Sequence, residues 1–118
     1  MLKHTLRFIG ILFVLVGMSF AVSAQDSTNL TYGDSATGQI DNETYEDFYT
    51  FEGNAGDTII IMMTATDDAP NRLDSYLILR DAEGIQLAFD DDGAQNLNSR
   101  IGPFTLPEDR TYTIVATR

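Results

Sequence analysis

Short apolar stretches separated by turn residues recur from residue 35 onward, and they constrain the fold more than any other feature. Clusters of Gly, Asn, Asp and Pro, such as residues 53–57 and 81–84, interrupt them at regular spacing, and no window carries a useful helical period. The pattern predicts seven strands, at residues 35–40, 47–52, 58–66, 75–80, 85–90, 99–106 and 111–117. We therefore predict an all-β fold, an antiparallel β-sandwich of jelly-roll or immunoglobulin-like kind.

Alternation within these strands predicts the core, because side chains two residues apart lie on the same face of a strand. Ile60 and Met62 point away from the predicted core, so strand 58–66 is apolar on both faces, which favours a central strand over an exposed binding stripe. The predicted core residues are Tyr49, Phe51, Ile59, Ile61, Met63, Leu77, Leu79, Tyr112 and Ile114.

The first 24 residues are typical of a secretory signal peptide. Lys3, His4 and Arg7 form a basic start, residues 8–18 (FIGILFVLVGM) are apolar, and residues 22–24 (VSA) are small, as a signal peptidase requires. The alternative is an uncleaved membrane anchor over residues 6–24. We predict cleavage after Ala24 and an extracellular or cell-surface protein, with a flexible lead-in over residues 25–34 and one domain over residues 35–118.

Composition excludes several kinds of chemistry for the processed chain. Its 94 residues contain no Cys, His, Lys or Trp, and 5 Arg face 18 acidic residues, which gives a net charge of −13. Nucleophilic systems based on Ser-His, Cys-His or Lys are therefore excluded, as is zinc bound by nitrogen and sulfur ligands. The acidic surface opposes binding to nucleic acid and favours divalent cations or basic partners.

Six segments, in order, resemble the bacterial pre-peptidase C-terminal domain family. Its members read approximately D-Y-Y-x-F-x-x-x-A-G-D, L-D-x-Y-L-x-L-x-D, G, N-D-D and L-P-x-x-G-x-Y-x-I. The matching segments are residues 47–59 (DFYTFEGNAGDTI), residues 73–81 (LDSYLILRD), Gly84, Asp91 with Asp92, residues 105–107 (TLP) and residues 111–114 (TYTI).

The resemblance implies a secreted, non-catalytic β-sandwich that accompanies extracellular peptidases and other exported proteins. The family has Gly in its last turn where this chain has Arg110, so that turn requires another conformation or strains a non-glycine residue. Family members also continue to one more strand after the strand of Tyr112. We therefore expect either a truncated product or an unpaired edge on strand 111–117 that another segment completes.

Consecutive carboxylates at Asp90, Asp91 and Asp92 form the best candidate for a metal site. Calcium prefers several oxygen ligands, and Asp74, which precedes a strand, can join them from another loop. The alternative is a solvated turn with one carboxylate accepting backbone hydrogen bonds. In collagenase modules of the family, calcium ligands lie partly around the D-Y-Y segment, where Asp47 matches.

These features leave three classes of function. The first is a non-catalytic accessory module, with calcium as an optional structural ligand and no required cofactor. We expect such a module to be a monomer, to bind an unidentified extracellular protein or polymer, and to bind neither nucleic acid nor, after cleavage, a membrane. The second is an adhesion or assembly module completed by a partner strand, and the third is a hydrolase that uses two carboxylates.

Overall fold

The computed structural model describes residues 2–10, 26–66 and 72–118, and within these ranges every regular element is a strand. The side chains of Leu2, Phe8, Ile9 and Gly10 lie outside the description. The strands are β1 (Leu2–Gly10), β2 (Ser27–Asn29), β3 (Ser35–Ile40), β4 (Asp47–Gly53), β5 (Thr58–Ala65), β6 (Tyr76–Arg80), β7 (Gln86–Asp90), β8 (Ser99–Thr105) and β9 (Arg110–Thr117).

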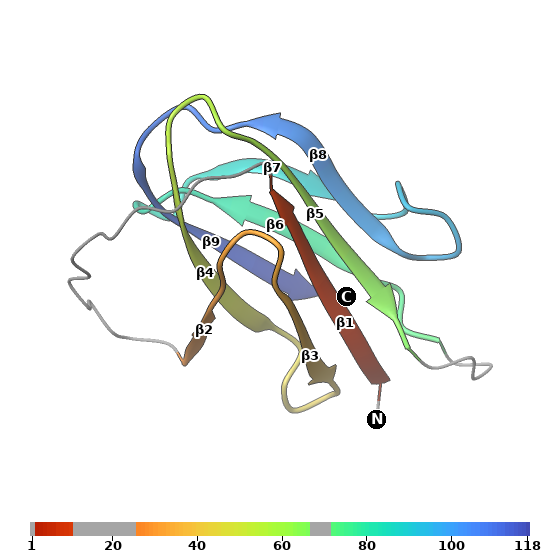
Figure 1. Ribbon diagram of the computed structural model, residues 1–118. Coiled ribbons are helices and arrows are strands. Elements are labelled where there is room, and N and C mark those ends of the chain that lie inside the picture. Colours follow the sequence, from red (N-terminus) through yellow and green to blue (C-terminus); the bar gives the residue numbers. More distant parts are fainter. Residues whose placement is uncertain (1, 11–25, 67–71) are drawn as a thin grey trace.

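The strands form two sheets that pack into a β-sandwich (Figure 1). One sheet has the order β3-β1-β5-β8, and the other has the order β2-β4-β9-β6-β7. Neighbouring strands are antiparallel throughout, apart from the parallel pair of β2 and β4. The predicted β-sandwich is therefore confirmed, with β1 and β2 added to the seven predicted strands.

The core lies between the two sheets, and every core residue predicted from the alternation is buried. The ring of Phe51 on β4 stacks on Tyr112 of β9, with centroids 5.4 Å apart. Strand β5 lies between β1 and β8, so it is the central strand that its two apolar faces predicted. Residues that alternation did not identify complete the core: Leu6, Leu30, Ile40, Ala65, Leu73, Ile101, Leu106 and Ala116.

Two glycine turns lead the chain between strands as expected. Gly56 and Gly84 have φ of 87° and 83°, a region that suits glycine because it has no Cβ. The described non-glycine residues with positive φ do not include Arg110, so this residue does not take the conformation that glycine would allow. Its side chain instead forms ion pairs with Asp81, Glu83 and Glu108. The last turn therefore adopts another conformation, which was one of the two expected outcomes.

The structure places the first part of the predicted signal peptide in strand β1. This strand lies between β3 and β5 and pairs with both (Figure 1). Residues 11–25, which include the predicted cleavage site and most of the alternative membrane anchor, lie outside the described residues, so cleavage stays a prediction. The described ranges contain no helix long and apolar enough to cross a membrane.

Residues 26–34 differ from the predicted flexible lead-in. Residues 27–29 pair with β4 as strand β2, and the Leu30 amide donates to the Thr50 carbonyl at 2.8 Å. Leu30 is also part of the buried core. The segment is mostly polar and gives little periodicity, but Leu30 is buried, Tyr32 packs against the core, and backbone hydrogen bonds join the segment to β4.

The expected unpaired edge on the last strand is wrong. Strand β9 lies inside its sheet, because it pairs with β4 along one side and with β6 along the other. Its backbone groups are thus used on both sides, and no partner strand can add to it.

Replacing Ile61 by Ala should strongly destabilise the fold. Ile61 on β5 is fully buried, so the truncation removes apolar contacts and leaves a cavity that costs about 2–5 kcal/mol. Ile85→Ala is the matched control, because Ile85 is 58% exposed, and it should change stability by less than about 0.5 kcal/mol. Urea unfolding followed by circular dichroism measures both changes. Equal losses in the two variants would show that β5 does not occupy the core.

Candidate functional site

Three of the predicted metal ligands meet at one end of the sandwich. Asp74 lies before β6, whereas Asp91 and Asp92 follow β7. Each offers a carboxylate oxygen, and these oxygens lie within 4.8 Å of one another. All three residues are exposed. The structure therefore brings together acids from two loops that are separated by a complete hairpin.

Two buried serines hold these loops together. The Oγ atoms of Ser75 and Ser99 lie 2.7 Å apart, and both residues are fully buried. Ser99 Oγ also lies 2.7 Å from the carbonyl oxygen of Ser75 and 2.5 Å from that of Asp91. Because Ser75 directly follows Asp74, this serine pair fixes the backbone beside two of the three carboxylates.

The loop between β7 and β8 has an unusual backbone that the serine pair also supports. Gln95, Asn96 and Leu97 have φ of 67°, 53° and 63°, a left-handed conformation that non-glycine residues seldom adopt. The Leu97 carbonyl accepts hydrogen bonds from both the amide and the hydroxyl of Ser75, at 3.1 and 2.9 Å. These contacts fix the loop that carries Asp91 and Asp92.

The electrostatics of the cluster favour a cation. Partial desolvation raises the pKa of the Asp91 carboxyl above its ordinary value, and the neighbouring charges of Asp92, Asp74 and Asp90 raise it further. Each of these charges repels the others at neutral pH. A divalent cation would replace this repulsion with attraction.

The geometry of the cluster also suits calcium. Calcium–oxygen distances are about 2.4 Å, so two oxygens bound to one ion lie at most about 4.8 Å apart. The three carboxylates satisfy this limit without rearrangement of the backbone. The oxygens of Asp74, Asp91 and Asp92 are therefore spaced as oxygen ligands of one divalent cation would be.

Asp90, the fourth acid in the predicted group, has a different role. Its Oδ2 atom accepts hydrogen bonds from the Gly93 amide at 2.8 Å and from the Arg100 amide at 2.7 Å. It therefore caps the turn after β7 and ties that turn to β8. The alternative interpretation expected such a carboxylate at Asp91 or Asp92, whereas the structure has it at Asp90, beside the cluster.

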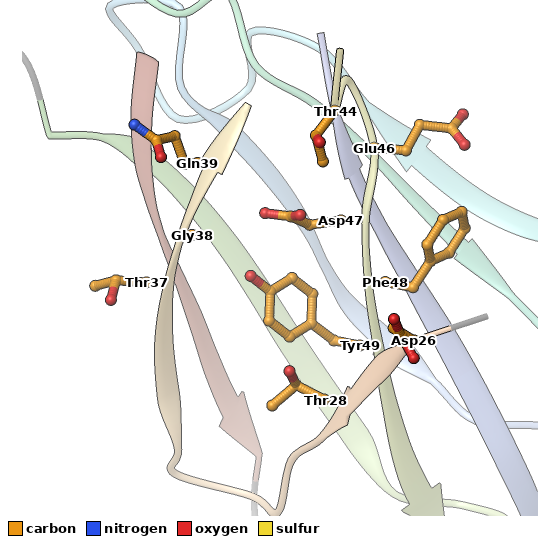
Figure 2. Close-up of a pocket in the computed structure, with 10 residues that line it drawn as sticks. All are labelled: Asp26, Thr28, Thr37, Gly38, Gln39, Thr44, Glu46, Asp47, Phe48 and Tyr49. Carbon is orange, nitrogen blue, oxygen red and sulfur yellow. The ribbon is translucent and has the colours of Figure 1, made fainter. Parts of the chain in front are cut away.

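The remaining predicted acid, Asp47, lies in a separate cleft of about 440 Å³ between β2, β3 and β4. Figure 2 shows Asp47 and Tyr49 pointing from β4 toward Gly38 of β3, whereas Glu46 and Phe48 point away. Burial raises the pKa of the Tyr49 hydroxyl to about 12, with a further contribution from the Asp47 charge. The hydroxyl is thus protonated at neutral pH. The structure does not bring Asp47 to the three-aspartate cluster.

Sequence reasoning missed the partner of Asp47. The Nε2 atom of His4 on β1 lies 2.6 Å from Asp47 Oδ2, and His4 is fully buried. A Cβ atom at Gly38 would lie too close to the Asp47 carboxylate and the His4 ring, so a larger residue would displace these side chains. The contact could not be predicted from the sequence, because His4 is a single histidine within the predicted signal peptide and lies 43 residues from Asp47.

The comparisons with known proteins identify the domain. A model of the bacterial pre-peptidase C-terminal domain matches residues 45–118, from just before β4 to the end of β9. The chain belongs to this family. The resemblance inferred from the sequence motifs is thereby confirmed. The pre-peptidase C-terminal domain is an accessory domain of secreted peptidases, and its match here covers strands β4 to β9 but not β1 to β3.

A probable subtilase-type serine protease of Deinococcus radiodurans is 44% identical to the chain over 66 residues. The aligned region is 56% of this chain and 9% of that protease, so the match compares a domain with a small part of a much longer protein. No solved structure matches the chain significantly.

Replacing Ser99 by Ala should destabilise this pre-peptidase C-terminal domain by about 1–3 kcal/mol, because buried partners lose their hydrogen bonds. Ser35→Ala is the matched control, since Ser35 is exposed on β3, and it should have little effect. Urea unfolding measures the loss, and amide exchange of residues 91–98 should accelerate in Ser99→Ala alone. Equal stability of the two variants would refute the role of the serine pair.

Asp91→Asn should raise the melting temperature at pH 7 in the presence of a chelator. Because the folded-state pKa of Asp91 is raised, its charge disfavours the folded state above that pKa. The advantage of the amide should disappear as the pH falls below the ordinary carboxyl value of 3.8, where both side chains are neutral. Glu43→Gln removes the same charge from an exposed turn and should show a smaller effect. A gain for Asp91→Asn that is independent of pH would contradict this explanation.

Proposed function

We propose that the chain is an extracellular, non-catalytic accessory module whose loops are stabilised by calcium bound to Asp74, Asp91 and Asp92. The observation that carries the proposal is the convergence of these three carboxylates within the span of one ion, on loops held by Ser75 and Ser99. Membership of the pre-peptidase C-terminal domain family supports the accessory role.

Export is supported by the match to a family of secreted peptidase domains and by the signal-like first 24 residues. The chain has no Cys, so disulfides contribute nothing to its stability outside the cell. A bound calcium ion supplies stability in their place, because it binds the folded arrangement of loops and not the unfolded chain. The ion would join the segment before β6 to the loop after β7.

The module acts through binding, and we expect a monomer that contacts an extracellular protein or polymer. Its acidic surface, with a net charge of −11 over the whole chain, favours basic partners and opposes association of like copies. Calcium at the cluster would neutralise part of this charge. No further cofactor is required.

The cluster is poorly arranged for the hydrolase alternative. Two carboxylates that hydrolyse a glycosidic bond flank that bond on either side, whereas the carboxylates of this cluster converge on one another. The three side chains are also exposed rather than enclosed in a cleft. Both features favour an ion over a substrate.

Calcium at millimolar concentration should raise the melting temperature of the full chain by about 5 °C or more relative to a chelator. This estimate assumes a dissociation constant near 10⁻⁴ M, as in extracellular modules, and about 4–8 °C per kcal/mol for a domain of this size. The double variant Asp91→Asn, Asp92→Asn should lose the response.

Glu43→Gln is the control for the loss of an exposed acid, and it should keep the full response to calcium. Calorimetric titration with calcium should give one site per chain. An identical melting temperature with calcium and with chelator would refute the calcium site while leaving the accessory role intact.

A further inference from the structure

Strand β1 fills a long site between two other strands. Its residues pair with six residues of β3 on one side and with seven residues of β5 on the other, antiparallel in both cases. This backbone pairing continues the sheet from β3 to β5, as Figure 1 shows. We call this site the β3/β5 groove.

Side chains of β1 give the groove its specificity. Leu6 is fully buried in the core, and His4, two residues earlier on the same face, is fully buried against Asp47. Arg7, on the opposite face, is exposed. The groove therefore selects a large aliphatic side chain and a hydrogen-bond donor two residues before it.

The same residues belong to the predicted signal peptide. If the chain is cleaved after Ala24, β1 is no longer covalently attached to the domain. The backbone groups of β3 and β5 that it paired then need another strand, because unpaired buried groups are costly. The Asp47 carboxylate would also lose His4 as its partner.

We propose that the β3/β5 groove is a strand-binding site, occupied by Leu2–Gly10 before processing and by an extended segment of another protein afterwards. That segment carries Lys, Arg or His two residues before a Leu or Ile. Insertion of a foreign strand into an incomplete sandwich is an established mode of recognition.

Charge supports a cationic occupant. Asp47 lies at the floor of the groove beside Gly38, and Asp26 lines the cleft next to it. Loss of Lys3 and Arg7 with the leader makes the domain more acidic, with a net charge of −13. A basic donor at the His4 position gains a charge-assisted hydrogen bond with Asp47.

The leader strand itself fits imperfectly. The Nδ1 atom of His4 is buried and has no hydrogen-bond partner among the described residues. An unsatisfied buried atom weakens the bound state. A strand that leaves no buried polar atom unpaired at this position would fit the groove better, and this fit does not depend on the calcium cluster at the other loops.

A strand-capture experiment tests the proposal. The full chain receives a site-specific protease sequence after Ala24, is cut, and is mixed with a fluorescent peptide of residues 2–10, LKHTLRFIG. Fluorescence anisotropy should show saturable binding of one peptide per chain. If the cut chain unfolds, recovery of its circular dichroism spectrum on addition of the peptide is the equivalent readout.

Variants isolate the contact with Asp47. The peptide with His4→Ala should bind about tenfold more weakly or worse, whereas the control peptide with Arg7→Ala should bind within about threefold of the original at physiological salt. In a chain carrying Asp47→Asn, the original peptide and the His4→Ala peptide should bind alike, because the coupled pair is already lost.

Three results would overturn the proposal. The first is a lack of capture of the labelled peptide by the cut chain, whether that chain is folded or unfolded. The second is a dimer of the cut chain that excludes the peptide, because a second copy of the chain would then occupy the groove. Equal binding of the original and His4→Ala peptides to the unmodified groove would remove the role of Asp47.

Discussion

Backbone pairing of β1 with both β3 and β5 is the constraint on which the rest of this sandwich depends. Strands β3 and β5 are too far apart in their sheet to bond directly, so β1 must supply hydrogen bonds to both. Leu6 of β1 adds a buried side chain to the core beneath it. The pairing thus links the edge strand β3, and with it Gly38 and the Asp47 cleft, to the central strand β5.

A second principle governs part of the acidic surface, where six of the described aspartates accept hydrogen bonds from backbone amides. Asp41 illustrates it: the amides of Thr44 and Glu43 donate to its carboxylate and hold its pKa below the ordinary value. The acids used in this way are Asp34, Asp41, Asp57, Asp81, Asp90 and Asp109. The cluster of Asp74, Asp91 and Asp92 differs, because its carboxylates converge on one another. Desolvation raises the pKa of Asp91, and the neighbouring carboxylate charges raise it further.

Local patterns in the sequence predicted much of the fold. Alternation placed Tyr49, Ile61 and Tyr112 in the core, because a strand with one buried face imposes a period of two. Turn residues such as Gly56 and Gly84 marked the strand boundaries, because their positive φ suits glycine. The strand β1 could not be predicted, since an apolar leader gives the same signal whether it is removed or inserted in a sheet. The parallel strand β2 is too short and polar to show a period.

The candidate site was predicted only in part, because its assembly depends on contacts between loops. The run of three adjacent acids in the sequence predicted Asp91 and Asp92 as site residues. It could not show that Asp90 has a different role, because that role depends on hydrogen bonds from the amides of Gly93 and Arg100. The approach of Asp74 depends on the hydroxyls of Ser75 and Ser99. The contact of His4 with Asp47 spans 43 residues and joins two segments with no shared motif.

Hydrogen–deuterium exchange on the intact and the processed chain tests the central role of β1 most directly. In the intact chain, the amides of β3 and β5 that pair with β1 should be protected. After removal of residues 1–24, with no strand added, they should exchange much faster than the amides shared by β4 and β9. Equal protection of β5 in both forms would contradict the account, because the groove would then close without a strand.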